Sequence, residues 1–334
     1  MQDITIDYII PTYYDSSIVK SSLDKLCRQT MKDSLKVIIV NDCSPNTDCN
    51  YQDIIDEYRD ILDITVVKTP ENIGTGMARQ FGIDNTTHPY IMFQDDDDML
   101  SSKYAIEAFV KEVEKADESV IGIVSGWKET DSKGNILAEK SGKDMYTCIV
   151  RLIYRDILDK YGIKFDPDMS MIFEDKDFGM KYLYILNKYG YTEKYLNDNY
   201  YVYIRDNEFS TMNNTSVYKT DLYHAILKFK EYKFKQEHEE DNNILWKLLN
   251  EAFELSFFSI IRNIVSPGIS KNDLTLLRNI IEDNYDKLED EYEIQKNSII
   301  YNLKNLGLLD NVEENYNIFL SNPFGLIDAL MEKI

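Results

Sequence analysis

One stretch of sequence indicates the fold most directly: Tyr90-Ile91-Met92-Phe93-Gln94-Asp95-Asp96-Asp97-Asp98. Its first four residues form a short apolar run, which predicts a buried strand. Four aspartates follow with no turn residue between. Adjacent carboxylates repel one another unless a cation or a network of donors neutralises them. A solvated acidic cap is the alternative and the commoner role of acidic runs. A cation site at the end of a core strand is the sharper hypothesis.

Strand and helix patterns alternate through the first hundred residues around this stretch. The strands are expected at Ile4–Ile10, Lys36–Val40, Ile64–Lys68 and Tyr90–Phe93. Helices are expected between them, at Ser16–Gln29, Tyr51–Ile61 and Thr75–Ile83. This order predicts an α/β fold: a Rossmann-like, mainly parallel sheet with helices on both faces.

The rest of the chain divides into a mixed segment and a helical one. After residue 100 we expect helices at Lys103–Glu114, Tyr146–Leu158 and Asp175–Tyr189, and strands at Val120–Trp127 and Tyr200–Arg205. From about Thr220 onward, apolar residues recur at helical spacing. We therefore expect one domain over residues 1–215 and an all-helical C-terminal domain over 216–334. The helical part could contact an acceptor, a partner, or another copy in a homo-oligomer.

Composition limits the classes of function. Lys and Arg number 37 against 59 Asp and Glu, which gives a net charge of −22 and disfavours a generic grip on nucleic acid or anionic membranes. No apolar stretch reaches about 18 residues, and Met1–Asp7 has no basic residue, so neither an integral membrane segment nor a signal peptide is expected. The four cysteines lack CxxC spacing, which suits reduced thiols and a cytoplasmic location.

Polar residues follow each predicted strand of the parallel sheet. The carboxyl ends of such strands lie on one edge, where ligands bind. These ends carry Thr12-Tyr13-Tyr14-Asp15, Asn41-Asp42, Glu71-Asn72 and Asp95–Asp98. Taken singly, the aspartates could cap helices and Asn72 could lie in a turn with Gly74. Together they predict a polar binding crevice.

The aspartate run predicts a metal site, because hard oxygen ligands suit Mg²⁺ or Mn²⁺, usually together with substrate phosphates. If the run is extended, side-chain alternation points Asp95 and Asp97 the same way and Asp96 the opposite way. Asp95 and Asp97 are therefore the expected pair at the site.

Six segments in order resemble the inverting family-2 glycosyltransferases, which have the GT-A fold. They are Pro11–Asp15, Asn41–Ser44, Asn72–Gly74 with Ala78–Gly82, Asp95–Asp98, Arg155–Leu158 with Phe165 and Glu174-Asp175, and Tyr201–Arg205 with Ser210. The resemblance covers about Ile4 to Ser210. It implies that residues 1–215 are a GT-A catalytic domain using a UDP-sugar donor and Mn²⁺ or Mg²⁺.

The resemblance also implies roles for residues of the donor site. Asp42 would accept a hydrogen bond from the base, Thr12 and Tyr13 would line base and ribose, and Asp95 would hold ribose. Asp97 would hold the metal that bridges the diphosphate. The donor-binding set implied by position is Pro11, Thr12, Tyr13, Asp15, Asp42, Asn72, Gly74, Arg79, Asp95 and Asp96.

The same resemblance implies that Asp175 is the general base and that Glu174 supports it, although both acids could instead cap a helix. A single in-line displacement would invert the anomeric carbon. Trp127, Arg205 and Ser210 are candidates for acceptor or diphosphate contact. The alternatives are a core position for Trp127 and a plain loop for the other two.

The leading hypothesis is therefore a metal-dependent transfer of sugar from a UDP-sugar to a hydroxyl of a glycan or surface polymer, in the cytoplasm of a bacterial or phage-infected cell. One alternative acceptor is a hydroxymethylated base in phage DNA, against which the negative charge counts. Another alternative is a non-catalytic nucleotide-sugar-binding module of the same fold. A nucleotide-sugar pyrophosphorylase is disfavoured, because Pro11–Ser17 lacks the glycine and basic residues of a triphosphate loop.

Overall fold

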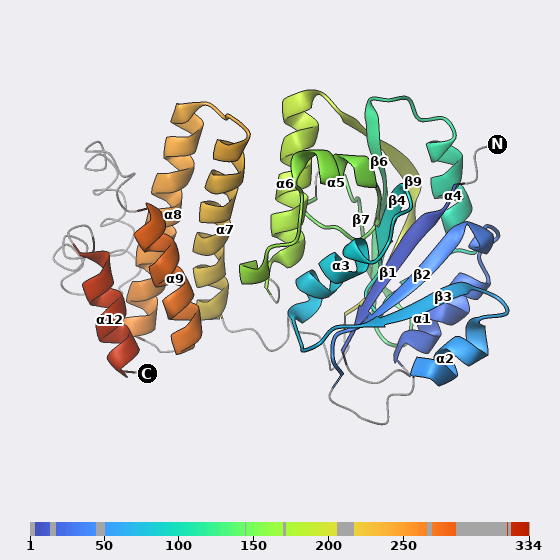
Figure 1. The fold of residues 1–334 in the computed structure, drawn as a ribbon, viewed down its shortest axis with the longest axis horizontal. Helices are drawn as coiled ribbons and strands as arrows, with labels where there is room; N and C mark the ends of the chain where they lie inside the picture. The colour runs from blue at the N-terminus through green and yellow to red at the C-terminus, as the bar shows by residue number, and fades with distance from the viewer. Residues whose placement is uncertain are drawn as a thin grey trace. The chain divides into compact units, whose positions relative to one another are not determined.

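The computed structural model describes residues 4–13, 18–44, 51–143, 145–169, 172–205, 217–265, 269–284, 319 and 322–333 of the 334. The chain forms two compact units, Met1–Ser210 and Thr211–Ile334 (Figure 1). The first unit contains a β-sheet covered by helices, and the described part of the second is helical.

A nine-stranded sheet forms the centre of the first unit, in the order β3-β2-β1-β4-β8-β6-β9-β5, with β7 paired to β6. The strands are β1 (Ile6–Thr12), β2 (Leu35–Asn41), β3 (Asp63–Lys68), β4 (Tyr90–Phe93), β5 (Met99–Leu100), β6 (Val120–Thr130), β7 (Ile136–Lys140), β8 (Arg151–Tyr154) and β9 (Thr192–Ile204). β1 to β4 are mutually parallel, and β8 runs antiparallel between β4 and β6. The expected mainly parallel α/β sheet is confirmed.

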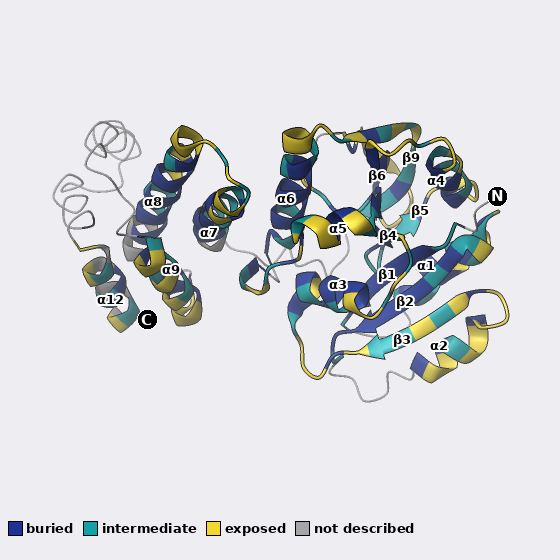
Figure 2. Ribbon diagram, turned by 45° about the horizontal axis from the view of Figure 1, so that its top comes forward, coloured by how far each residue is buried: buried dark blue, intermediate teal, exposed yellow. Residues whose placement is uncertain are grey.

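Helices cover both faces of this sheet. They are α1 (Ile18–Cys27), α2 (Tyr51–Tyr58), α3 (Gly74–Asp84), α4 (Ala105–Val113), α5 (Arg155–Tyr161) and α6 (Glu174–Tyr189), with short 3₁₀ turns η1 (Lys32–Ser34) and η2 (Pro167–Met169). Burial follows this layering: β1 is buried throughout and β2 at every residue except the half-buried Lys36, while β3, at the edge, has only exposed and half-buried residues (Figure 2).

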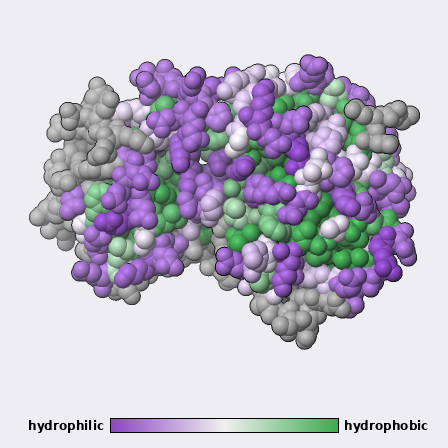
Figure 3. All heavy atoms as spheres, in the orientation of Figure 1, coloured by the Kyte–Doolittle hydropathy of each residue, from purple (hydrophilic) through white to green (hydrophobic). Residues whose placement is uncertain are grey.

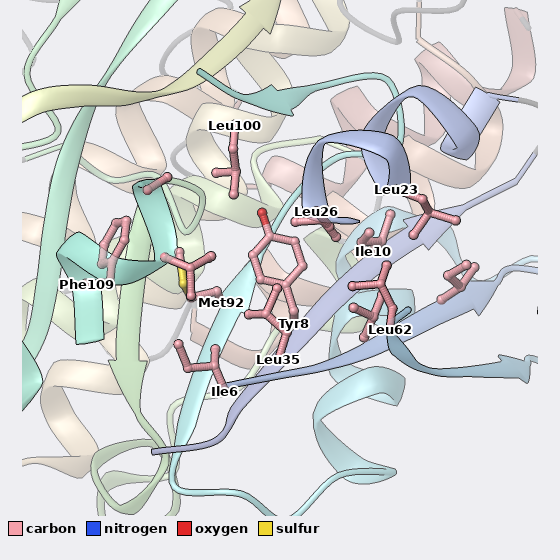
Figure 4. Close-up of a cluster of buried hydrophobic side chains, with 14 of the residues drawn as sticks. Ile6, Tyr8, Ile10, Leu23, Leu26, Leu35, Leu62, Met92, Leu100 and Phe109 are labelled. Atoms are coloured by element: carbon pink, nitrogen blue, oxygen red, sulfur yellow. The ribbon is translucent and has the colours of Figure 1, made fainter. Parts of the chain in front are cut away.

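One face of the sheet packs on α1, α2 and α4. Alternate residues of β1, namely Ile6, Tyr8 and Ile10, point into this core because side chains on a strand alternate between faces. Leu23 and Leu26 of α1 meet them there, three residues apart on one side of the helix (Figure 4). This apolar layer fixes the strands whose ends form the candidate site.

The other face holds α3 and α6. A side chain at Gly82 of α3 would come within 2.5 Å of Ile9 Cγ2, so only glycine lets this helix lie directly on β1. Phe178 of α6 stacks on Phe165 with ring centroids 4.3 Å apart, and Phe93 of β4 meets Phe165 edge-on at 5.6 Å. These contacts bring the first turn of α6 toward the carboxyl end of β4.

The helix expected over Tyr146–Leu158 is wrong. Arg151–Tyr154 forms strand β8 instead, and α5 begins only at Arg155. The segment is drawn into the sheet because it pairs with β4 on one side and β6 on the other, which buries Leu152 and Ile153 completely. Tertiary pairing here overrides the helical pattern of the local sequence.

A buried ionic network closes the amino edge of the sheet, opposite the strand ends predicted to bind ligand. Asp7 of β1 is fully buried and accepts hydrogen bonds from Arg155 Nη2 at 2.8 Å and from the His88 backbone at 2.9 Å. Arg155 also donates to the carbonyls of His88 and Ile83, at 2.7 and 3.1 Å. Arg155, part of the family-like motif, thus joins β1, β4, α3 and α5 away from the candidate site.

The second unit is built from α7 (Val217–Glu237), α8 (Asn242–Val265), α9 (Lys271–Asn284) and α12 (Pro323–Lys333). Phe229 of α7 packs on Phe253 of α8 with centroids 5.2 Å apart, and Tyr223 donates to Asp273 of α9 at 3.0 Å. None of the helices in the described residues has the length and apolar content to cross a membrane. Hydrophilic residues cover much of the face drawn in Figure 3.

Arg155→Met should lower the free energy of unfolding by about 3 kcal/mol, because it leaves the buried Asp7 carboxylate without its cation. Urea denaturation followed by circular dichroism measures this. Arg59→Met is the control, since Arg59 pairs with Asp56 on the surface and its loss should change stability by less than about 1 kcal/mol. Equal effects of the two substitutions would contradict a structural role for Arg155.

Candidate active site

The four aspartates that follow β4 form a turn. The Asp98 amide donates to the Asp95 carbonyl at 3.1 Å, so the run folds back on itself and then enters β5. The extended geometry assumed for side-chain alternation is therefore wrong. Asp95, Asp96 and Asp97 are half-buried, whereas Asp98 is completely buried. The four acids consequently have different environments and different roles.

Asp98 is committed to holding the protein together. Its Oδ2 accepts a hydrogen bond from the Tyr201 hydroxyl at 2.6 Å, and its Oδ1 accepts one from the Ile204 amide at 3.2 Å. The Tyr201 hydroxyl in turn accepts from the Asp95 amide at 3.2 Å. Burial, followed by the charges of Asp95 and Asp97, raises the Asp98 pKa well above its ordinary value. This carboxyl joins the turn to the end of β9, a role that sequence reasoning missed.

Gln94 supports the turn from beneath. Its side chain is fully buried, accepts from the Tyr8 hydroxyl at 2.6 Å and donates to the Asp98 carbonyl at 3.2 Å. It also donates to the Ser22 hydroxyl of α1. A polar residue between the apolar strand and the acids was the available signal for this role. This hydrogen-bond network fixes the position of the turn relative to the sheet.

Arg79 connects the acidic turn with a second pair of acids. Its guanidinium is 3% exposed, and it donates through Nη2 to Asp95 at 2.5 Å and through Nη1 to Glu174 at 3.1 Å. The ring of Phe165 lies 5.9 Å from the guanidinium carbon. Since Asp95 follows β4 and Glu174 begins α6, one cation holds two distant segments together. A donor contact for Arg79 stays a prediction.

Glu174 and Asp175 form the first turn of α6. Burial raises the Glu174 pKa to about 7, with a further increase from the Asp175 charge and an opposing effect from Arg79. Burial also raises the pKa of Asp175, against the effect of Arg79. The Lys176 amide donates to Asp175 Oδ1 at 2.8 Å, which orients that carboxyl. Both side chains are half-buried, and a carboxylate whose pKa is raised above its ordinary value accepts a proton more readily than an exposed one.

Cys148 lies near the same cluster of charged side chains. The thiol is 1% exposed, and burial raises its pKa to about 12, although the charge of Arg79 opposes this shift. The charges of Asp175, Asp95 and Glu174 also act on it. Cys148 precedes β8, and the helix expected there hid this placement from sequence reasoning.

Asp42, after β2, organises the start of α3. Its Oδ1 accepts from the Ile73 amide and the Thr69 hydroxyl, each at 2.9 Å, and its Oδ2 accepts from the Gly74 amide at 2.8 Å. Gly74 has φ 81°, which favours glycine. Asn72 donates to the Asp42 carbonyl at 3.5 Å. The helix-cap alternative is thus realised at α3, and the contact with a base stays a prediction.

The end of β1 lies beside Asp42 and beside Asp96 of the acidic turn. The Asp42 amide donates to the Thr12 carbonyl at 2.8 Å, and the Tyr51 hydroxyl of α2 donates to Thr12 Oγ1 at 3.4 Å. Burial and the Asp97 charge raise the pKa of Asp96 to about 7, while a hydrogen bond with Thr12 opposes them. Pro11 is buried within β1, and Tyr13 directly follows it, half-buried. Tyr51 is a neighbour that sequence reasoning did not identify.

The remaining candidates are placed less directly. Trp127 is 9% exposed and packs with Val124, Val150 and Tyr201, which fits its core alternative. Arg205 pairs with Glu129 at 2.7 Å and is about half exposed. Two further candidates, Asp15 and Ser210, lie outside the described residues.

The ligands that the acidic side chains offer can be compared with those that a divalent cation needs. Within the described part of the chain, no three His, Cys, Asp or Glu side chains are arranged to hold a metal ion. Asp98 is committed to Tyr201 and Ile204, and Asp95 shares its charge with Arg79. One or two carboxylates with substrate phosphates are the usual ligands of Mg²⁺. The acidic turn therefore fits a cation held jointly with a diphosphate.

Comparison with known proteins identifies the family. A family model described as Glycosyl transferase family 2 matches residues 7–178. Poly(ribitol-phosphate) beta-N-acetylglucosaminyltransferase TarP of Staphylococcus aureus is 24% identical over 274 residues, which cover 75% of this chain and 81% of TarP. Glycosyltransferase GlyA of Streptococcus pneumoniae is 28% identical over 129 residues, and the match spans only 18% of its length. Poly(ribitol-phosphate) beta-glucosyltransferase of Bacillus spizizenii is 26% identical over 216 residues, which span 33% of its length.

A solved structure has a similar fold. Residues 1–349 of S. aureus TarS, in complex with UDP-GlcNAc, superpose with a TM-score of 0.63 at 17% identity, covering 94% of this chain and 91% of that one. At this identity the match concerns the fold.

Tyr201→Phe should destabilise the chain by about 1–3 kcal/mol, because the buried Asp98 carboxyl loses a donor. The Ile204 amide, which binds the same carboxyl, should exchange its hydrogen faster. Urea denaturation and amide exchange measure the two effects. Tyr200→Phe is the matched control on β9, since the Tyr200 hydroxyl makes an exposed bond to Asp198 and its loss should change stability by less than about 0.5 kcal/mol. An unchanged Ile204 exchange rate in Tyr201→Phe would contradict the role of Asp98.

Proposed function

Because the chain belongs to glycosyl transferase family 2, we propose that this glycosyltransferase moves a sugar from a UDP-sugar to a hydroxyl of a polymer acceptor, with inversion at the anomeric carbon. The observation that carries the proposal is the Arg79 bridge. It holds Asp95 of the acidic turn and Glu174, beside Asp175, around one point at the carboxyl edge of the sheet. A diphosphate-binding element and a candidate base are thereby brought together.

The donor would lie along the ends of β1, β2 and β4. Thr12 and Asp42, joined by a backbone hydrogen bond of 2.8 Å, offer polar groups to a base and ribose. Asp97 would hold the Mn²⁺ or Mg²⁺ ion. When bound, the cation supplies Lewis-acid stabilisation of the leaving diphosphate. Support for a UDP donor comes from the fold shared with TarS, whose structure contains UDP-GlcNAc.

Asp175 would take the proton of the attacking hydroxyl. Its raised pKa makes the carboxylate a stronger base than an exposed aspartate, and the Lys176 amide holds it in one orientation. As the acceptor oxygen forms its bond to the anomeric carbon, the bond to the diphosphate breaks on the opposite side. A single displacement of this kind inverts the configuration. Glu174, fixed by Arg79, would position Asp175 or the acceptor.

The acceptor is proposed to be a surface polymer bearing hydroxyl groups. TarP, which aligns over 81% of its length, and the B. spizizenii relative are both named for poly(ribitol-phosphate). Modified DNA is a weaker candidate acceptor. The net charge of −22 repels a polyanion wherever the surface lacks a local basic patch. A polyol phosphate is also repelled by this charge, but less strongly, since its phosphates are more widely spaced than those of duplex DNA.

Asp97→Ala should weaken UDP binding in the presence of Mn²⁺ by about 10²-fold or more, because a metal–diphosphate contact contributes several kcal/mol. Isothermal titration of UDP with and without Mn²⁺ measures this for the wild type and the variant. The control is Asp33→Ala, which removes a carboxylate whose side chain is 91% exposed and which lies before β2, away from the strand ends. Metal-independent UDP binding by the wild type would remove the basis for a metal site.

Asp175→Asn should retain UDP-sugar affinity within about threefold while transfer falls by about 10²–10⁴-fold, because only the base is removed. In the wild type, kcat/KM should fall on acidification through a pKa above the ordinary carboxyl value of 3.8, since the base must be ionised and burial raises its pKa. Binding is measured by titration and transfer by UDP release across the pH range.

The control for this variant is Asp156→Asn, an exposed aspartate in the first turn of α5. It should leave both affinity and transfer unchanged. If Asp175→Asn loses donor binding, Asp175 belongs to the donor site instead. A wild-type chain that binds UDP-sugar but neither hydrolyses nor transfers it to any polymer tested would favour the non-catalytic binding module.

A further inference from the structure

Arg151, the first residue of β8, is the bulkiest fully buried side chain among the described residues. Its Nε donates to Glu193 of β9 at 2.9 Å, and both side chains are at most 1% exposed. Removing two charges from water is costly, and a buried pair is often no more stabilising than apolar residues of similar volume. Stability alone therefore does not explain why this ion pair is buried.

The rest of the guanidinium binds backbone carbonyls. Nη2 donates to the Gly142 carbonyl at 3.0 Å, and Nη1 donates to the Thr147 carbonyl. Glu193 thus orients Arg151, and Arg151 holds the chain that leads into β8. A lysine could not make these contacts together, because it lacks the planar fork of three nitrogens.

The segment held in this way, residues 145–150, is also fixed from outside. At Gly179 of α6, a Cβ atom would lie 2.5 Å from the carbonyl of Tyr146, so the segment rests directly on the helix whose first turn carries Asp175. At its other end, Val150 has φ 59° and its carbonyl accepts from the Ser125 amide at 3.0 Å. A non-glycine residue at positive φ is costly and must be held by its surroundings.

We propose that Arg151 is a positioning residue for sugar transfer, in that it holds residues 145–150 against α6 so that Cys148 closes the site beside Asp175. The inference rests on the proposed function. Cys148 is buried while Met145 and Tyr146, in the same segment, are 42% and 53% exposed. Cys148 is thus the inner residue of the segment and limits the space around Asp175. Met145 and Tyr146 are an outer apolar pair that is available to an acceptor.

The first test measures the clamp without using activity. N-ethylmaleimide labelling of the folded chain, followed for each cysteine by peptide mass spectrometry, reports the exposure of Cys148, with Cys27 as the internal reference. A double variant, Arg151→Met with Glu193→Leu, removes the carbonyl donors without leaving a lone buried charge. Cys148 should then be labelled about tenfold faster, because losing even one such hydrogen bond raises the open population by that order.

The second test measures transfer in the same double variant. UDP affinity and the KM for UDP-sugar should stay near wild type, while kcat falls by about 10²-fold, because a small displacement beside the base misplaces the acceptor. Arg151→Lys keeps a cation opposite Glu193 and should fold, yet it should share the faster labelling and the lower kcat. A merely structural ion pair would be rescued by lysine.

Arg155→Met, at the residue that directly follows β8, is the matched control. It also removes an arginine, here half-buried, that binds an aspartate and two carbonyls, and it should lower stability without changing Cys148 labelling or kcat. Wild-type labelling or wild-type kcat in both Arg151 variants would overturn the proposal. If the wild-type chain transfers no sugar, the proposed function fails, whereas the labelling still decides whether Arg151 holds the segment.

Discussion

The gathering of acids at one edge of the sheet is the constraint on which the candidate site depends. Asp95 and Glu174 would repel each other if they met alone, and the buried guanidinium of Arg79 removes that repulsion by binding both. Because Arg79 comes from α3, which packs closely on β1 where residue 82 is glycine, the packing of helix on strand determines where the guanidinium lies. Packing and electrostatics are therefore two parts of one arrangement at this edge.

Some acids of this edge hold parts of the fold together. Asp98 is satisfied by Tyr201 and Ile204, and Asp42 by three donors at the start of α3. These carboxylates hold β9 and α3 in place. Asp97 and Asp175 are half-buried, and their roles as metal ligand and base stay predictions.

Two arginines flank the body of strand β8 and serve opposite edges of the sheet: Arg151 is its first residue, and Arg155, the first residue of α5, directly follows it. Arg155 ties Asp7 and the amino ends of β1 and β4 together, away from the candidate site. Arg151 binds Glu193 and two carbonyls at the edge where the acids gather. Each guanidinium binds a carboxylate and two carbonyls: the half-buried Arg155 closes the fold at one edge, and the buried Arg151 orders a segment beside the proposed base at the other.

The sequence by itself determined the alternation of strands and helices and the edge at which the acids lie, because apolar periodicity and the parallel connection rule are local properties. It also identified the motifs that agree with the family. It did not determine that Asp95–Asp98 turns, that Tyr146–Leu158 contains a strand, or which acids are already bound. Those outcomes rest on contacts between residues far apart in the chain, such as Arg79 with Glu174 and Asp98 with Ile204, and only tertiary packing brings such groups together.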